Sequence, residues 1–303
     1  MKYDILLIGG NGFVGRRLAA KLQLNGFRVL LPTRNISASN ELRLLPNTNL
    51  VDANVGEFDV LKKLCSQVKP NGVVINLVGV LHDKPAVPYG KVFRDAHVTL
   101  VKNIISCMQI YGLKRYLHMS ALGADSSGPS MYQRSKGDAE NSIRESHLDW
   151  TIFRPSVIFG RDDEFINLFI KLCKIFPILP LANSTAKFQP VNVDDVASAF
   201  LQALSKSKTI HHAYDLVGPQ VLTMKEIVNF SARKARTYCL VISIPQFLGY
   251  LQATMFELLP FRTLMSRDNI ASMAIPNVLP KNSRDALVED FGIARHSLED
   301  LFF

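Results

Sequence analysis

The stretch IGGNGFVGRRL, residues 8–18, decides the fold of this chain because it places three glycines between a strand and a helix. The residues before it are an apolar run typical of a buried strand, and those after it repeat apolar side chains at helical spacing. Gly9, Gly12 and Gly15 follow the pattern G-x-x-G-x-x-G. Glycine costs about 0.5–1 kcal/mol relative to alanine inside regular structure. Three of them therefore indicate a backbone that turns tightly or approaches something closely.

In this context the glycine turn predicts a phosphate cradle. The N-terminus of a helix offers unpaired N–H groups and a partial positive charge, which suit a pyrophosphate. We expect dinucleotide contacts from Gly9, Gly12, Phe13, Val14 and Gly15, with the last glycine letting the helix pack on the strand. The alternative is a turn that only closes a strand–helix corner, but strand, motif and helix coincide where a first βαβ unit should begin.

Apolar runs alternate with helical patterns up to residue 155, which predicts a Rossmann-like, doubly wound parallel sheet of the α/β class. The expected strands are residues 3–8, 28–32, 50–53, 72–80, 115–120 and 150–153, and the expected helices are 13–24, 57–67, 92–111 and 131–146. Prolines and helical stretches of mixed polarity follow. We therefore predict a dinucleotide-binding core over residues 1–155 and a small, mainly helical C-terminal lobe over 156–303, with 213–217 returning to the sheet.

The end of the second expected strand indicates which dinucleotide is bound. An acidic residue there would bind the free 2′-hydroxyl of NAD, whereas this chain has Arg34. A guanidinium suits a 2′-phosphate, so NADP(H) is the preferred cofactor and NAD(H) the alternative; the arginine could also be merely solvated. Polar or small residues at other strand ends extend the expected cofactor crevice: Asp52, Asn76, Gly79 and Pro155.

Three residues form a candidate set for hydride-transfer chemistry. Tyr132 and Lys136 stand at i and i+4, so a helix presents them on one face, and Ser120 ends the preceding strand. A phenol has a pKa of about 10, and a neighbouring ammonium lowers it by favouring phenolate. We expect Tyr132 to act as acid or base, Lys136 to bind the nicotinamide ribose and Ser120 to bind the substrate oxygen. The alternative is a partly buried tyrosine beside a solvated lysine.

The overall charge favours anionic partners. The 303 residues carry 35 Lys and Arg against 26 Asp and Glu, giving a net charge of +9. The sequence lacks a basic run with interleaved aromatic residues, so nucleic acid is not an expected partner. The cysteines are far apart and form no C-x-x-C pair, and neither they nor the adjacent His211 and His212 suggest a metal site. A reduced, cytoplasmic protein is expected, without a signal peptide before the first strand.

One long apolar stretch, residues 239–261, bears on membrane association. Its prolines and polar residues argue against a lipid-spanning helix, so we predict an amphipathic surface helix. Together with the basic charge, this stretch is compatible with a peripheral position on the inner face of a membrane.

Several motifs together resemble the extended and atypical short-chain dehydrogenase/reductase superfamily. They are GGNGFVG, the set of Ser120, Tyr132 and Lys136, and FRPSVIFG at residues 153–160. More narrowly, three later motifs are similar to the NAD(P)H-binding accessory subunit of respiratory complex I and its bacterial relatives. These motifs are FGRDDEF (159–165), FQPVNVDDV (188–196) and SRDNI (266–270), so the resemblance covers nearly the whole chain.

The resemblance implies a Rossmann fold with bound NADP(H) and a lobe over the nicotinamide. It assigns the glycines to the pyrophosphate, Arg34 to the 2′-phosphate, and Ser120, Tyr132 and Lys136 to the catalytic set. There is one departure. Extended members usually carry Asn-Val after the fourth strand, where this chain has His97-Val98, which puts the usual asparagine contact in doubt.

Three functions follow as alternatives. The first is an NADP(H)-dependent oxidoreductase acting on a hydrophobic small molecule, because the set around Tyr132 is intact and the apolar residues 247–264 suit a lipid-like substrate. The second is a non-catalytic, NADPH-binding accessory or assembly protein of a respiratory or quinone-synthesis membrane complex. A nucleotide-sugar epimerase or dehydratase is the third, and the departure at His97 ranks it last.

Overall fold

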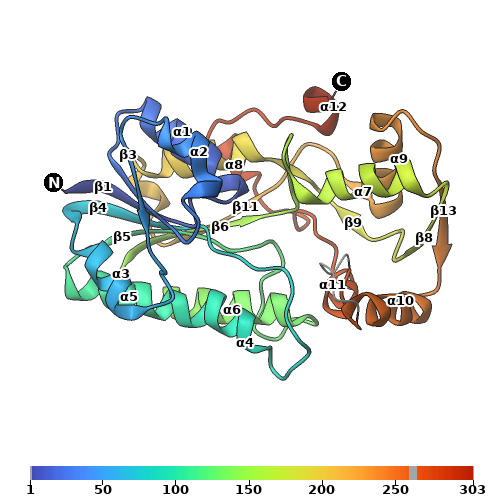
Figure 1. The fold of residues 1–303 in the computed structure, drawn as a ribbon, viewed down its shortest axis with the longest axis horizontal. Helices are drawn as coiled ribbons and strands as arrows, with labels where there is room; N and C mark the ends of the chain where they lie inside the picture. The colour runs from blue at the N-terminus through green and yellow to red at the C-terminus, as the bar shows by residue number, and fades with distance from the viewer. Residues whose placement is uncertain (1, 259–264, 303) are drawn as a thin grey trace.

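A seven-stranded parallel sheet forms the centre of the computed structural model, which describes residues 2–258 and 265–302 (Figure 1). Its strand order is β11-β6-β5-β4-β1-β2-β3. The strands are β1 (Tyr3–Ile8), β2 (Val29–Thr33), β3 (Thr48–Asp52), β4 (Val68–Asn76), β5 (Arg115–Met119), β6 (Asp149–Pro155) and β11 (His212–Leu216). Because the order reverses on either side of β1, the doubly wound α/β fold is confirmed.

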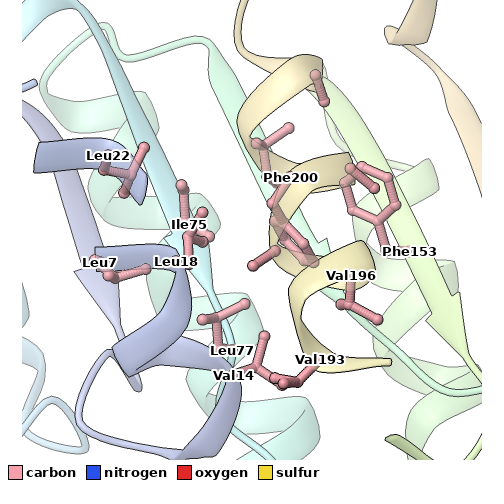
Figure 2. Packing of buried hydrophobic residues seen from close by; sticks show 14 of the residues in the cluster. Leu7, Val14, Leu18, Leu22, Ile75, Leu77, Phe153, Val193, Val196 and Phe200 are labelled. Carbon is pink, nitrogen blue, oxygen red and sulfur yellow. The ribbon is translucent and has the colours of Figure 1, made fainter. Parts of the chain in front are cut away.

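Helices cover both faces of this sheet, as the alternating apolar pattern requires. One face carries α1 (Phe13–Leu24) and α8 (Val193–Ala203), whose side chains meet Leu7, Ile75 and Phe153 of the strands (Figure 2). The other face carries α3 (Phe58–Cys65), α5 (Leu100–Ile110) and α6 (Met131–Arg144). Short elements complete the core: η1 (Ser37–Ser39), α2 (Asn40–Arg43), α4 (Lys91–Phe93), the π-helical turn η2 (Arg94–Thr99) and η3 (Ser207–Thr209).

The C-terminal part adds a lobe with its own apolar core at the end of the molecule away from the N-terminus (Figure 1). Its longer elements are α7 (Glu164–Ile175), β8 (Ile178–Ala182), α9 (Met224–Lys234), β13 (Leu240–Ile244), α10 (Gln246–Leu258), α11 (Arg267–Ser272) and α12 (Leu298–Phe302). The short ones are β7 (Ile158–Phe159), β9 (Lys187–Phe188), β10 (Val191–Asn192) and β12 (Leu222–Thr223). The π-helical turn η4 (Ala286–Asp290) instead packs on the central sheet beside β11, where Ala286 and Leu287 are buried.

Two elements differ from the sequence-based expectations. The fourth strand ends at Asn76 rather than at residue 80, because the Asn76 side chain accepts a hydrogen bond from the Val78 N–H and bends the chain out of the sheet. The single amphipathic helix expected over 239–261 is wrong in its first part. Residues 240–244 instead form strand β13, which pairs in parallel with β8, and only the part from Gln246 is helical. Residues 259–261 lie outside the described residues.

Candidate functional site

The glycine turn has the close backbone packing that its sequence suggests. Gly9 has a φ of 78°, and a Cβ there would lie 3.0 Å from the backbone of Leu77. A Cβ on Gly15 would lie 2.5 Å from the backbone of Gly10, so the first turn of α1 fits against the loop only with glycine. Gly12 is the N-cap of α1, makes no side-chain cap, and is followed by no acidic residue in the first turn. The positive end of this helix is therefore suited to an anion.

Phe13 and Val14 turn their side chains into the protein. Val14 is buried in the core beneath α1 (Figure 2). The Phe13 ring packs on Gly160, where an added Cβ would come within 2.7 Å of the ring. Phe13 and Val14 can therefore bind a phosphate only through their backbone N–H groups, at the first turn of α1.

The residues expected at the adenosine side lie at neighbouring strand ends. Thr33, which precedes Arg34, is the register partner of Asp52, and both Arg34 and Asp52 are exposed. The segment after β2 contributes to a cavity of about 210 Å³, which is lined by Arg16, Ser37, Ser39, Asn40, Glu41 and Leu42. Arg16 was missed in the sequence analysis, although its place directly after the last glycine was a usable signal. Its Nε donates to the Asn11 carbonyl oxygen at 3.0 Å, which holds it across the turn.

Asn76 ends β4, and Gly79 lies in the loop that follows it, residues 77–80, which we call the β4 loop. Asn76 is buried, and its Oδ1 accepts from the Val78 N–H at 3.1 Å while its Nδ2 lies 3.3 Å from the Tyr116 hydroxyl. Gly79 is exposed, and a Cβ there would lie 3.6 Å from Lys136 Nζ. The β4 loop and the lysine of α6 therefore meet. Pro155 is buried at the end of β6, where its carbonyl accepts from the Leu122 N–H at 2.9 Å.

Tyr132 and Lys136 lie one turn apart on α6, as their spacing predicts. Lys136 is buried, and its Nζ donates to the Met119 carbonyl oxygen at 3.2 Å and lies 3.5 Å from that of Val78. Burial lowers the pKa of Lys136 to about 8. Burial also raises the pKa of Tyr132 to about 12. The expected lowering by Lys136 is not seen here, because the ammonium is directed at two carbonyls and desolvation of the phenol dominates.

Ser120 is held by the buried carboxylate of Glu140, which two partly exposed arginines bind. Its hydroxyl donates to Glu140 Oε1 at 2.6 Å. Arg154 binds both carboxylate oxygens of Glu140, with its Nε 2.8 Å from Oε1, and Arg144 Nη2 lies 3.2 Å from Oε2. A hydroxyl has one proton to donate. The structure therefore brings Ser120 together with Glu140, which accepts the hydrogen bond from its hydroxyl.

His97 fills the position where the sequence departs from the extended members. It is buried within η2, where its Nε2 accepts from the Val80 N–H at 3.1 Å. Burial lowers the pKa of His97 to about 2, so the ring is neutral and its Nδ1–H donates to Ser135 Oγ at 2.8 Å. The ring stacks on Phe93 and meets the Tyr132 ring edge-on, at centroid distances of 5.4 and 5.7 Å. His97 thus connects the β4 loop, through Val80, to α6, through Ser135 and Tyr132.

The C-terminal lobe anchors the start of α6 through Asp268 of α11. Its two carboxylate oxygens accept from the Met131 N–H at 2.6 Å and from the Tyr132 N–H at 3.1 Å. A carboxylate at a helix N-terminus is stabilised by the helix dipole. The sequence analysis noted Asp268 only as part of SRDNI, and no pattern in the chain indicated its partner.

Over residues 2–258 and 265–302, no group of three or more His, Cys, Asp or Glu side chains is arranged to hold a metal ion. In the same part of the chain, no helix is both long and apolar enough to cross a membrane.

Comparisons with known proteins place these features in context. NADH dehydrogenase [ubiquinone] 1 alpha subcomplex subunit 9, mitochondrial, of Arabidopsis thaliana is 31% identical over 246 residues, covering 79% of this chain and 60% of the relative. This chain thus spans 60% of that protein's length. The Mus musculus protein of the same name is 27% identical over 299 residues, covering 97% and 77%. A Thermus thermophilus UDP-glucose 4-epimerase, solved in complex with NAD, has a TM-score of 0.68 at 17% identity, covering 89% of this chain and 96% of that one; it supports the fold alone.

A family model extends over both halves of the site. It matches residues 5–217, which include the glycine turn, the β4 loop and α6. On this match, the chain belongs to the NAD dependent epimerase/dehydratase family.

Proposed function

We propose that this protein holds NADP(H) at the carboxyl edge of its sheet and serves as a nucleotide-binding accessory or assembly protein of a membrane complex, rather than as a turnover enzyme. The observation that carries this proposal is the commitment of the Ser120 hydroxyl to Glu140. The cradle for the pyrophosphate is open to an anion, whereas the hydroxyl that would polarise a carbonyl donates to a buried carboxylate. The similarity to the complex I subunits of plant and mouse supports the same role.

In this role the nucleotide is a structural ligand. Its pyrophosphate would lie against the first turn of α1 and its nicotinamide ribose near Tyr132 and Lys136, so one molecule would bridge both halves of the sheet. A ligand that binds only the folded state stabilises it by mass action. We place the protein in the cytoplasm, peripheral on the inner face of the membrane.

We infer a preference for NADP(H) from Arg34 at the end of β2 and from Arg16, which follows the last glycine of the turn. In an Arg34→Asp variant, a charge-assisted hydrogen bond worth about 1.5–3 kcal/mol is lost and repulsion is added. NADPH affinity should therefore fall about 10–100-fold, while NADH affinity changes little. Titration of NADPH and NADH fluorescence measures both constants. Lys102→Asp, with the same charge change on the exposed side of α5, is the matched control and should keep the wild-type ratio.

An oxidoreductase is the second candidate, favoured by Lys136, whose pKa of about 8 lets it titrate near neutrality beside Tyr132. The two roles differ in the effect that Tyr132→Phe should have on NADPH oxidation. For the accessory role we expect NADPH to co-purify with the wild type and with the variant alike, and no NADPH oxidation when aliphatic ketones and a short-chain quinone are offered. Oxidation at 340 nm by the wild type that Tyr132→Phe abolishes would establish the enzyme instead. A wild-type protein that binds neither nucleotide would contradict both.

A further inference from the structure

The parallel pair β8–β13 has one face in the core and one face in solvent. Leu181 and Val241 point toward α7 and α9 and are buried. Ile178, Leu240 and Ile242 alternate with them and are exposed. In a half-buried sheet the solvent side is normally polar. Here both sides are apolar, so this solvent side differs from the exposed faces of ordinary sheets.

Helix α10 continues this apolar surface. It follows β13 directly, and both lie at the end of the molecule away from the N-terminus (Figure 1). Gly249 and Ala253 are buried, and a Cβ on Gly249 would lie 2.2 Å from that of Ala182, so the helix packs closely on the end of β8. The opposite side of the helix carries large apolar residues at helical spacing, and their exposed fractions are 69% for Phe247, 60% for Leu251, 61% for Met255 and 80% for Leu258.

The charges at the strand end of this surface are all of one sign, and the single acidic residue of α10, Glu257, is paired with Arg267. Neither residues 165–182 nor residues 228–256 contain an Asp or a Glu. The last turns of α7 and α9, and the loops that lead from them into β8 and β13, carry the basic residues Lys171, Lys174, Arg233, Lys234 and Arg236. Because Ile178 pairs with Leu240 at the start of the two strands, these cations border the apolar surface at that end.

We propose that this outer face, made of Ile178, Leu240, Ile242, Phe247, Leu251 and Met255, lies on an anionic membrane surface. The inference rests on the membrane part of the proposed function and names the surface that would carry it. Exposed apolar side chains bordered by cations match the chemistry of anionic lipid, because acyl chains bury the apolar groups and headgroups attract the cations. The one carboxylate of α10, Glu257, is neutralised by its ion pair with Arg267. A second copy of this chain fits less well, because a two-fold contact would bring the basic borders together.

Vesicle flotation tests this proposal with the full chain. The wild type should float with phosphatidylcholine vesicles containing phosphatidylglycerol, much less with phosphatidylcholine alone, and less at high salt. Phe247→Ser, Leu251→Ser and Met255→Ser combined should lower the partition coefficient at least tenfold. Because the three side chains are exposed, the variant should fold normally. A separate variant, Lys171→Glu with Lys174→Glu, should also bind the vesicles more weakly than the wild type, and its binding should depend less on salt. Each basic residue near the surface contributes about fivefold to the affinity for an anionic membrane.

The matched control removes three apolar side chains elsewhere that are even more exposed: Leu24→Ser, Leu44→Ser and Val87→Ser combined. It should float like the wild type. The proposal is overturned if the outer-face variant floats as well as this control, or if light scattering shows a wild-type dimer that the outer-face variant converts to a monomer. NADPH affinity, measured on the same samples, separates the two proposals. Loss of nucleotide binding with retained flotation contradicts the nucleotide role alone, and the reverse contradicts this one.

Discussion

Glu140→Leu is expected to lower the free energy of unfolding by about 1.5–3 kcal/mol, because the buried Ser120 hydroxyl and the partly exposed Arg154 guanidinium lose a charged hydrogen-bond partner. The Glu140 side chain is 2% exposed and binds Arg154, Arg144 and the Ser120 hydroxyl. It also supports the charge on Lys136, one turn away, whose pKa burial already lowers to about 8. In the leucine variant the guanidinium of Arg154 would lose both of its carboxylate bonds and Ser120 its acceptor.

Urea unfolding, followed by the fluorescence of the buried Trp150, measures this loss directly. That residue is the single tryptophan, and Arg144 lies over its ring. Glu140→Gln keeps the volume and one acceptor and should lose less stability than the leucine variant. Glu145→Gln, exposed at the end of the same helix, should behave as the wild type. A leucine variant as stable as Glu145→Gln would mean that Glu140 contributes nothing net, and the argument that it immobilises Ser120 would lose its energetic basis.

The backbone of the nucleotide site could be predicted from the sequence because its signals are local. A strand, three glycines at fixed spacing and an amphipathic helix lie within one short stretch, and each reports on its own neighbours. The same holds for Tyr132 and Lys136, whose relative position depends only on helical periodicity. The alternating pattern up to β6 therefore predicted the doubly wound sheet, with element ends displaced by a few residues, as at Asn76.

What the sequence could not predict depends on partners that are far away in the chain. Nothing next to Ser120 in the sequence shows that its hydroxyl donates a hydrogen bond to a carboxylate on α6. Asp268 reaches α6 from more than a hundred residues away. β13 read as part of a helix because an apolar run without strict alternation does not distinguish the two, and only its pairing with β8 decides it. Local pattern thus predicted the architecture, while the chemistry of the site depends on tertiary contacts.

The second large effect concerns acid stability, and it follows from His97. An exposed histidine has a pKa of about 6.5, whereas burial lowers that of His97 to about 2. Between these values the unfolded chain binds a proton that the folded chain does not. The stability due to the neutral ring is therefore complete above pH 6.5 and is lost as the pH falls, at about 1.4 kcal/mol per pH unit. From this residue alone, the free energy of unfolding should drop by about 2 kcal/mol between pH 6.5 and 5.

His97→Gln isolates this contribution, because an amide can accept from the Val80 N–H and donate to Ser135 but takes up no proton. We expect the variant to be less stable than the wild type at pH 7 and to lose about 2 kcal/mol less on going to pH 5. Burial also lowers the pKa of His118, so both proteins should still lose stability in acid through this second histidine. His147→Gln, at an exposed position, should reproduce the wild-type profile. Parallel pH profiles for His97→Gln and the wild type would show that the folded protein protonates this ring. His97 could not then join the β4 loop to α6 as a neutral group, because a protonated Nε2 no longer accepts from Val80.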